Sequence, residues 1–206
     1  MPKKERIFIS GAAGVIGTEM LAKLASHPDI QVLAGDKKSL PEGLAPNIEY
    51  WQGDLNQITL HELSQFEPSI FIHLAATFER SKESLDFWED NFDNNTRLSH
   101  HLMGLMKQLP SLKRVIFASS YLVYDEKLYQ FEKPQANPQR LSEEAAILPR
   151  NLVGMAKLAH ERELEFLNQF YSERFTAVSV RIFRGYGCGS RDVVSRWIRS
   201  LLAGEE

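Results

Sequence analysis

The sequence predicts an α/β protein built on a doubly wound parallel sheet with helices on both faces. Short, almost continuously apolar stretches, typical of strands buried on both sides, alternate with amphipathic stretches along the whole chain. This alternation implies right-handed crossovers between parallel strands. A glycine-rich turn joins the first apolar stretch to the first amphipathic one.

Length and composition restrict the class of protein. The chain has 206 residues, and its 27 acidic and 24 basic side chains give a net charge of −3. No basic excess favours nucleic acid or an anionic membrane as a partner, and no apolar run approaches the ~18 residues of a membrane span. The single cysteine, Cys188, excludes a disulfide framework and fits a reducing cytosol. We therefore expect residues 1–206 to form one cytoplasmic domain.

Six strands account for the apolar stretches. They are expected at residues 6–10, 30–35, 48–52, 69–75, 115–118 and 176–183. The fourth strand is entered through Pro68. The Pro- and Asn-rich segment 133–139 is the longest expected loop, and it follows the fifth strand. It should therefore lie at the carboxyl edge of the sheet, where ligands bind in open α/β folds.

Helices are expected between these strands. The spacing of four between Ile16, Met20 and Leu24 marks one face of the first helix, and a short helix covers residues 58–66. Two long helices and a final amphipathic helix follow, and Pro110 closes the first of the three. Their apolar stripes are Leu98, Leu102, Leu105 and Leu109; Leu152, Met155, Ala159, Phe166 and Phe170; and Val194, Trp197, Ile198 and Leu201.

Gly11, Gly14 and Gly17 form the turn between the first strand and the first helix. Small residues are needed there because the turn is tight, the backbone must approach a pyrophosphate, and the helix packs closely on the strand. Amides at the helix N-terminus would then face the phosphates. The GxxGxxG spacing is one residue longer than the general fingerprint between the first two glycines, but its place between strand and helix predicts a Rossmann-type nucleotide site.

Asp36 ends the second strand, 19 residues after Gly17. A carboxylate there accepts hydrogen bonds from both ribose hydroxyls of an adenosine and repels a 2′-phosphate, which favours NAD over NADP. The adjacent Lys37 and Lys38 leave a phosphate contact open as the alternative. Asp54, after the third strand, would bond the adenine amino group or serve equally well as a helix N-cap.

Six short motifs follow one another along the chain. They are Gly11-Ala12-Ala13-Gly14-Val15-Ile16-Gly17, Asp54-Leu55, His73-Leu74-Ala75-Ala76, Asn91, Ser119-Ser120-Tyr121-Leu122-Val123-Tyr124 and Arg181-Ile182-Phe183-Arg184-Gly185-Tyr186-Gly187. Together and in this order, these motifs are specific for one family. In them the chain resembles the extended short-chain dehydrogenase/reductase family, which includes NAD-dependent nucleotide-sugar epimerases and dehydratases. The resemblance implies NAD as cofactor, a nucleotide sugar as substrate, and a homodimer paired through the long helices. It implies further cofactor contacts at Val15, Ile16, Leu55, Leu74, Ala75, Ala76 and Asn91.

The chemistry of this family requires a serine, a tyrosine and a lysine around the nicotinamide. Ser120 matches the serine, which orients the substrate and stabilises the reacting oxygen. Lys157 matches the lysine, which holds the nicotinamide ribose and lowers the tyrosine pKa from its ordinary value of about 10. Val153 stands four residues earlier on the same helix face, where the family has its tyrosine. An isopropyl group carries no proton.

We therefore expect an NAD-binding protein of the epimerase/dehydratase type with impaired turnover. Tyr121 and Tyr124 are other phenols near the same sheet edge, but the matching motif gives them structural roles. Members of the family continue into a smaller lobe that grips the nucleotide sugar, so a sequence ending at Glu206 is expected to lack most of that lobe.

One alternative of a different class is a non-catalytic NAD-binding or scaffold protein on the same fold. No metal site is expected. His73 falls within a strand and is most simply a core residue hydrogen-bonded to the backbone.

Overall fold

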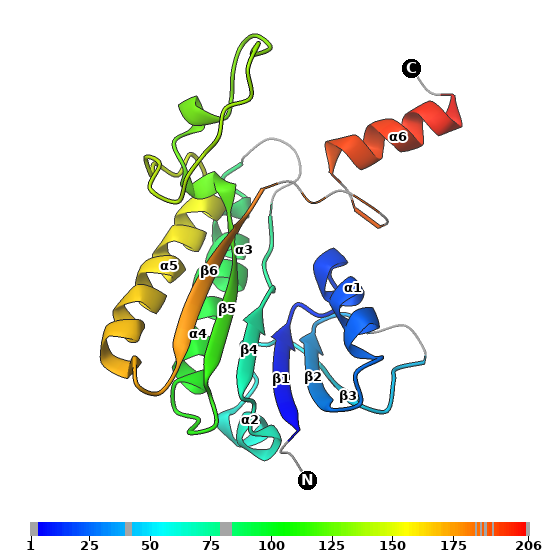
Figure 1. Cartoon of the computed structure of the whole chain (residues 1–206), viewed down its shortest axis with the longest axis vertical. Helices are drawn as coiled ribbons and strands as arrows, with labels where there is room; N and C mark the ends of the chain where they lie inside the picture. The colour runs from blue at the N-terminus through cyan, green and yellow to red at the C-terminus, as the bar shows by residue number, and fades with distance from the viewer. Residues whose placement is uncertain are drawn as a thin grey trace.

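Six parallel strands form one sheet in the computed structural model of the chain, in the order β3-β2-β1-β4-β5-β6 (Figure 1). The structure describes residues 4–39, 43–78, 84–183, 185, 187, 189–190 and 192–204. The strands are β1 (Glu5–Ser10), β2 (Ile30–Asp36), β3 (Ile48–Gln52), β4 (Ile70–His73), β5 (Arg114–Ser120) and β6 (Thr176–Ile182). This is the strand order of a Rossmann fold, and the predicted fold class is confirmed.

Helices cover the two faces of the sheet, and each face has its own apolar core. Helix α1 (Val15–Leu24) packs on one face through Leu21, against strand residues that include Ile7 and Ile9. Helices α2 (Leu60–Phe66), α4 (Leu98–Met106) and α5 (Leu152–Tyr171) cover the opposite face, where Phe8 points. Alternate residues of β1 thus face opposite cores, as the two-residue period of a strand requires.

The helix predicted from the stripe of Leu98, Leu102, Leu105 and Leu109 ends before Pro110, at Met106. The helical stretch begins with α3 (Phe87–Asn91), continues as the π-helical segment η1 (Phe92–Arg97), and ends with α4 at Met106, before a turn. The leucine stripe failed as a guide because it records burial alone: Leu109 is buried but lies in the turn. Asn91 is the last residue of α3 and lies within the helical stretch.

Two shorter elements also differ from expectation. Helix α2 begins at a capping box, in which Thr59 accepts a hydrogen bond from the Glu62 amide and the Glu62 side chain accepts one from the Thr59 amide. The helix-cap explanation of Asp54 is therefore wrong. Strand β4 ends at His73, so Leu74 and Ala75 leave the sheet and are free to line a site.

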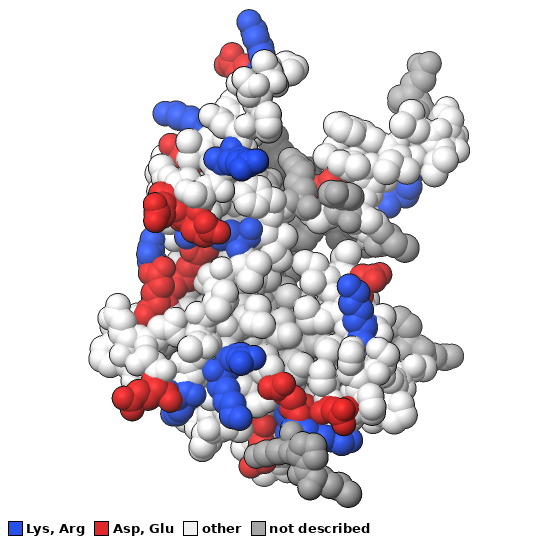
Figure 2. All heavy atoms as spheres, in the orientation of Figure 1, with Lys and Arg blue, Asp and Glu red and all other residues white. Residues whose placement is uncertain are grey.

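At its β6 edge the sheet is not covered on both faces. Val178 and Val180 on β6 are exposed, so the expectation of strands buried on both sides is wrong there. Helix α6 (Val193–Ala203) stands apart from the sheet (Figure 1), with its apolar side chains Trp197, Ile198 and Leu201 exposed. Acidic and basic side chains are intermixed over the face in Figure 2. None of the described helices is long and apolar enough to cross a membrane.

Candidate functional site

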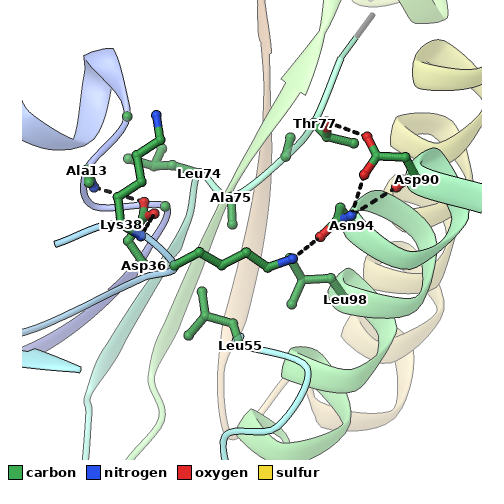
Figure 3. A pocket seen from close by; sticks show the side chains of 14 residues that line it. Ala13, Asp36, Lys38, Leu55, Leu74, Ala75, Thr77, Asp90, Asn94 and Leu98 are labelled. Carbon is green, nitrogen blue, oxygen red and sulfur yellow. Dashed lines mark hydrogen bonds between the residues drawn. The ribbon is translucent and has the colours of Figure 1, made fainter. Parts of the chain in front are cut away.

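A pocket of about 360 Å³ lies at the carboxyl ends of β1, β2 and β4 (Figure 3). This is the position at which open α/β sheets bind ligands, because the strand order reverses beside β1. The predicted cofactor residues that line the pocket are Gly11, Gly14, Asp36, Leu55, Leu74, Ala75 and Ala76.

The glycine turn forms the floor of this pocket by close backbone contact. Gly11 has a φ of +78°, and a Cβ there would lie 2.5 Å from the amide nitrogen of Ala75. A Cβ on Gly17 would lie 2.5 Å from the carbonyl oxygens of Gly11 and Ala12. Both positions therefore require glycine, the first for its conformation and both for space.

The first turn of α1 follows this glycine turn. Gly14 is the N-cap residue, and because glycine has no side chain it does not cap the amides of that turn. The side chains of Val15 and Ile16 are 44% and 43% exposed and do not line the pocket. Their backbone amides lie in the first turn of α1, and such amides are the groups that a helix N-terminus offers to a phosphate. The cofactor contacts of Val15 and Ile16 remain predictions.

Asp36 is anchored at the rim of the pocket by the backbone. Its Oδ2 accepts a hydrogen bond from the Ala13 amide at 2.9 Å, and its Oδ1 accepts one from the Lys38 amide at 3.0 Å (Figure 3). Lys37 extends across the pocket, where Nζ donates to Asn94 Oδ1 at 2.6 Å and lies 3.7 Å from Asp54 Oδ2. Lys37 thus faces an amide and a carboxylate.

Two predicted cofactor residues, Asp54 and Asn91, do not line the pocket. Asp54 Oδ1 accepts hydrogen bonds from the backbone and side-chain nitrogens of Asn56, at 3.1 and 3.2 Å. Burial acts to raise the pKa of Asp54, but these hydrogen bonds and the charges of Lys37 and Arg97 lower it overall. Asn91 is buried, and its Oδ1 accepts a hydrogen bond from Asn95 at 2.8 Å. Their cofactor contacts remain predictions.

The sequence reasoning missed the far wall of the pocket. Asp90, Asn94 and Leu98 line it from the helical stretch, and Thr77 lines it from the segment that follows β4. Asp90 accepts hydrogen bonds from Thr77 Oγ1 at 2.8 Å and from Asn94 Nδ2 at 2.7 Å (Figure 3). The spacing of four between the first three residues was the available signal.

Ser120, Val153 and Lys157 gather around the end of β5. Lys157 is 7% exposed, and its Nζ donates to the carbonyl oxygen of Ala118 at 2.8 Å, two residues before Ser120. Burial lowers the pKa of Lys157 to about 8. Val153 is also buried, one helical turn before Lys157. A Cβ on Gly154 would lie 2.4 Å from the carbonyl oxygen of Leu122, so the start of α5 touches the turn after Ser120.

The Ser120 hydroxyl accepts a hydrogen bond from the Leu122 amide at 3.2 Å and caps a short 3-10 turn, Tyr121–Val123. Neither Ser120, Val153 nor Lys157 lines the pocket at the glycine turn. The roles of these residues in catalysis remain predictions. Arg184, Tyr186 and Cys188 lie outside the described residues.

His73 is a core residue, but its partners are not backbone atoms. Its Nδ1 pairs with Ser10 Oγ at 2.6 Å and its Nε2 with Ser99 Oγ at 2.9 Å. Complete burial holds the pKa of His73 well below its ordinary value, so the ring is neutral. The ring thereby ties the ends of β1 and β4 to α4, directly below the pocket.

Residues 7–206 match the profile of a known family, described as the NAD dependent epimerase/dehydratase family. The chain belongs to the NAD dependent epimerase/dehydratase family. No match was found among curated protein sequences.

Solved structures agree with this family membership. The chain is similar to MoeE5, solved in complex with UDP-glucuronic acid and NAD, with 28% identity, 97% of this chain covered and a TM-score of 0.77. It shares its fold with UDP-glucuronic acid 4-epimerase from Bacillus cereus, at 23% identity, 97% coverage and a TM-score of 0.78. It also shares it with UDP-N-acetylglucosamine 4-epimerase from Methanobrevibacter ruminantium M1, at 24% identity, 99% coverage and a TM-score of 0.80. The chain covers 62% of the length of the first protein and 64% of each of the other two.

Proposed function

We propose that the chain binds NAD in the pocket above the glycine turn, as the cofactor-binding part of an epimerase or dehydratase that acts on nucleotide sugars. The observation that carries the proposal is the close packing of Gly11 and Gly17, which leaves the first-turn amides of α1 beside a pocket rimmed by Asp36. MoeE5, the 28% identical relative, was solved with NAD and UDP-glucuronic acid.

Each part of the site has a role in this proposal. The first-turn amides of α1 hold the pyrophosphate, and Asp36 accepts hydrogen bonds from the adenosine ribose. Lys157 binds the nicotinamide ribose, and Ser120 orients a substrate hydroxyl. NAD, when bound, supplies a hydride acceptor at a sugar carbon. In the family's mechanism, return of the hydride to the other face gives epimerisation, and earlier loss of water gives dehydration. Val153 cannot take the hydroxyl proton, so we propose low or absent turnover.

The selectivity proposed is for NAD over NADP. In this proposal the Asp36 carboxylate faces the 2′-phosphate of NADP and repels it. Support comes from the two backbone amides, of Ala13 and Lys38, that hold the carboxylate. The Lys37 ammonium, which could otherwise attract the phosphate, is engaged by Asn94 and Asp54.

Calorimetric titration with NAD and NADP tests the proposal directly. We expect tighter binding of NAD, and an Asp36→Asn variant should lose most of this preference because the charge that repels the 2′-phosphate is gone. Exposed Asp29→Asn is the matched control. Tighter binding of NADP, or binding of neither cofactor, would contradict the proposal. A thermal-shift panel of UDP-, GDP- and dTDP-sugars in the presence of NAD then identifies the substrate class.

The second candidate function is a non-catalytic NAD-binding or scaffold protein. Val153 favours it, because a buried valine stands where the proton carrier is expected. Binding of NAD without turnover of any nucleotide sugar would support this candidate over the first.

We further propose that the protein acts in the cytoplasm as a homodimer. The neighbouring helical segments α3, η1 and α5 expose five large apolar side chains, namely Trp88, Phe92, Met155, Phe166 and Phe170. A second copy would cover them by pairing these helices, because apolar patches of this kind mark protein interfaces.

A further inference from the structure

A buried ion pair lies beside the end of β5, outside the pocket. The side chains of Glu161 on α5 and Arg181 on β6 are 2% and 14% exposed. Arg181 Nε donates to Glu161 Oε1 at 3.1 Å, and Arg181 Nη2 donates to Glu161 Oε2 at 2.8 Å. The Ser119 hydroxyl donates to the same carboxylate. Both charges are therefore compensated by direct hydrogen bonds.

Arg181 extends this contact to two further segments. Its Nη1 donates to the carbonyl oxygen of Glu143 at 3.0 Å, in the loop that precedes α5. Its guanidinium lies 4.9 Å from the ring centroid of Tyr124, in the segment that follows β5. One ion pair thus joins α5, β6, the end of β5 and both neighbouring loops.

Lys157 and Glu161 act on consecutive residues of β5. They are one helical turn apart on the same face of α5. Lys157 donates to the Ala118 carbonyl, and Glu161 accepts from the Ser119 hydroxyl. Ser120 is the next residue along the strand.

We propose that Glu161 and Arg181 are a positioning pair, which fixes α5 against the end of β5 and thereby holds the Lys157 ammonium where the nicotinamide ribose of NAD would bind. The inference rests on the function proposed above. A bidentate contact between guanidinium and carboxylate fixes direction as well as distance. A buried ion pair adds little net stability, because the loss of hydration offsets the attraction. We therefore expect the Glu161–Arg181 pair to contribute to the position of Lys157 more than to the stability of the fold.

The test compares NAD with AMP as calorimetric ligands. AMP would occupy only the adenosine part of the site, at the glycine turn and Asp36, whereas NAD would also reach Lys157. We expect Glu161→Gln to weaken NAD binding about tenfold, equivalent to one charge-assisted contact, and to leave AMP binding unchanged. Glu67→Gln is the matched control, because Glu67 pairs with Arg6 at 3.5 Å on the surface, at the other end of the strands. It should change neither affinity.

Two further variants keep the test decisive. The double variant Glu161→Met/Arg181→Leu replaces both charges by apolar side chains, which buried ion pairs tolerate, and it should show the same selective loss. In a Lys157→Met background, Glu161→Gln should cost no further NAD affinity, because both residues act through one ammonium. Unchanged NAD binding by folded Glu161→Gln, or equal losses for NAD and AMP, would overturn the positioning role. Absence of NAD and AMP binding by the unaltered protein would instead contradict the proposed function.

Discussion

At the scale of single residues, the proposed loss of turnover is tested at Val153. It lies one helical turn before Lys157, so a tyrosine there would stand beside the ammonium at the end of β5. We expect Val153→Tyr to raise nucleotide-sugar-dependent turnover by roughly 10²-fold or more, the usual effect of one placed acid–base group. The measurement is the rate of NAD-dependent conversion of UDP-glucuronic acid and of the sugars found by thermal shift.

Val153→Phe is the control for this change, since it adds the ring without the hydroxyl. If the unaltered protein and the tyrosine variant turn over equally fast, either another phenol such as Tyr121 carries the proton or the assignment of this helix is incorrect.

Lys157 gives the stability of the protein a specific pH dependence. Burial lowers its pKa from 10.5 to about 8, whereas the unfolded chain keeps the ordinary value. Between these values the folded state releases its proton first, so the free energy of unfolding rises with pH. Compared with the unaltered protein, Lys157→Met should therefore lose relative stability from pH 8 to pH 10.5, by at most about 1.4 kcal/mol per pH unit.

Urea unfolding at several pH values measures this difference. Exposed Lys23→Met should show no such trend, and a flat difference for Lys157→Met would mean that the ammonium is not buried in solution.

At the scale of elements, two helical glycines have opposite roles. A Cβ on Gly17 in α1 would meet two carbonyl oxygens at 2.5 Å, whereas a Cβ on Gly104 in α4 would meet nothing within 4 Å. We expect Gly104→Ala to stabilise the protein by about 0.5–1 kcal/mol, since alanine favours the helix. Gly17→Ala should destabilise it and weaken NAD binding. Thermal unfolding measures the stability of both variants, and calorimetry measures their NAD affinity. If Gly17→Ala and Gly104→Ala change stability and NAD affinity equally, the close packing at Gly17 is refuted.

The elements also divide into those that a sequence can predict and those that it cannot. The strand–turn–helix at Gly11 was predictable because its pattern is local. The meeting of Lys37 with Asn94 was not, because it depends on how the helical stretch packs across the end of β2. The π-helical turns of η1 had no signal in the apolar periodicity, since residues 92–97 include few buried side chains. The exposed face of β6 at Val178 was not predicted, because an apolar stretch in the sequence indicates a strand buried on both faces.

At the scale of the whole molecule, the predicted association depends on the exposed apolar side chains of α3, η1 and α5. One of them, Phe166 on α5, is 59% exposed. We expect Phe166→Asp to convert a dimer to a monomer in sedimentation at micromolar concentration, because a charge would be buried at the interface without a partner. Leu148→Ser, at a similarly exposed apolar side chain in a loop, should leave the dimer intact. A monomer of 23.5 kDa for the unaltered protein would contradict the prediction.

The central place of β1 also bears on the order in which we expect the protein to fold. Ile7 pairs with Val32 on one side and with Ile70 on the other, so the first strand gains its second neighbour only after β2 and β3 have been synthesised. Strand pairings between segments far apart in the sequence form slowly, because the entropy cost of closing a long loop precedes the favourable contacts. Since the pocket lies at the carboxyl ends of β1, β2 and β4, a folding intermediate made of β1, β2 and β3 alone would lack part of the proposed cofactor site. NAD would therefore act on the late steps of folding and leave the early ones unchanged.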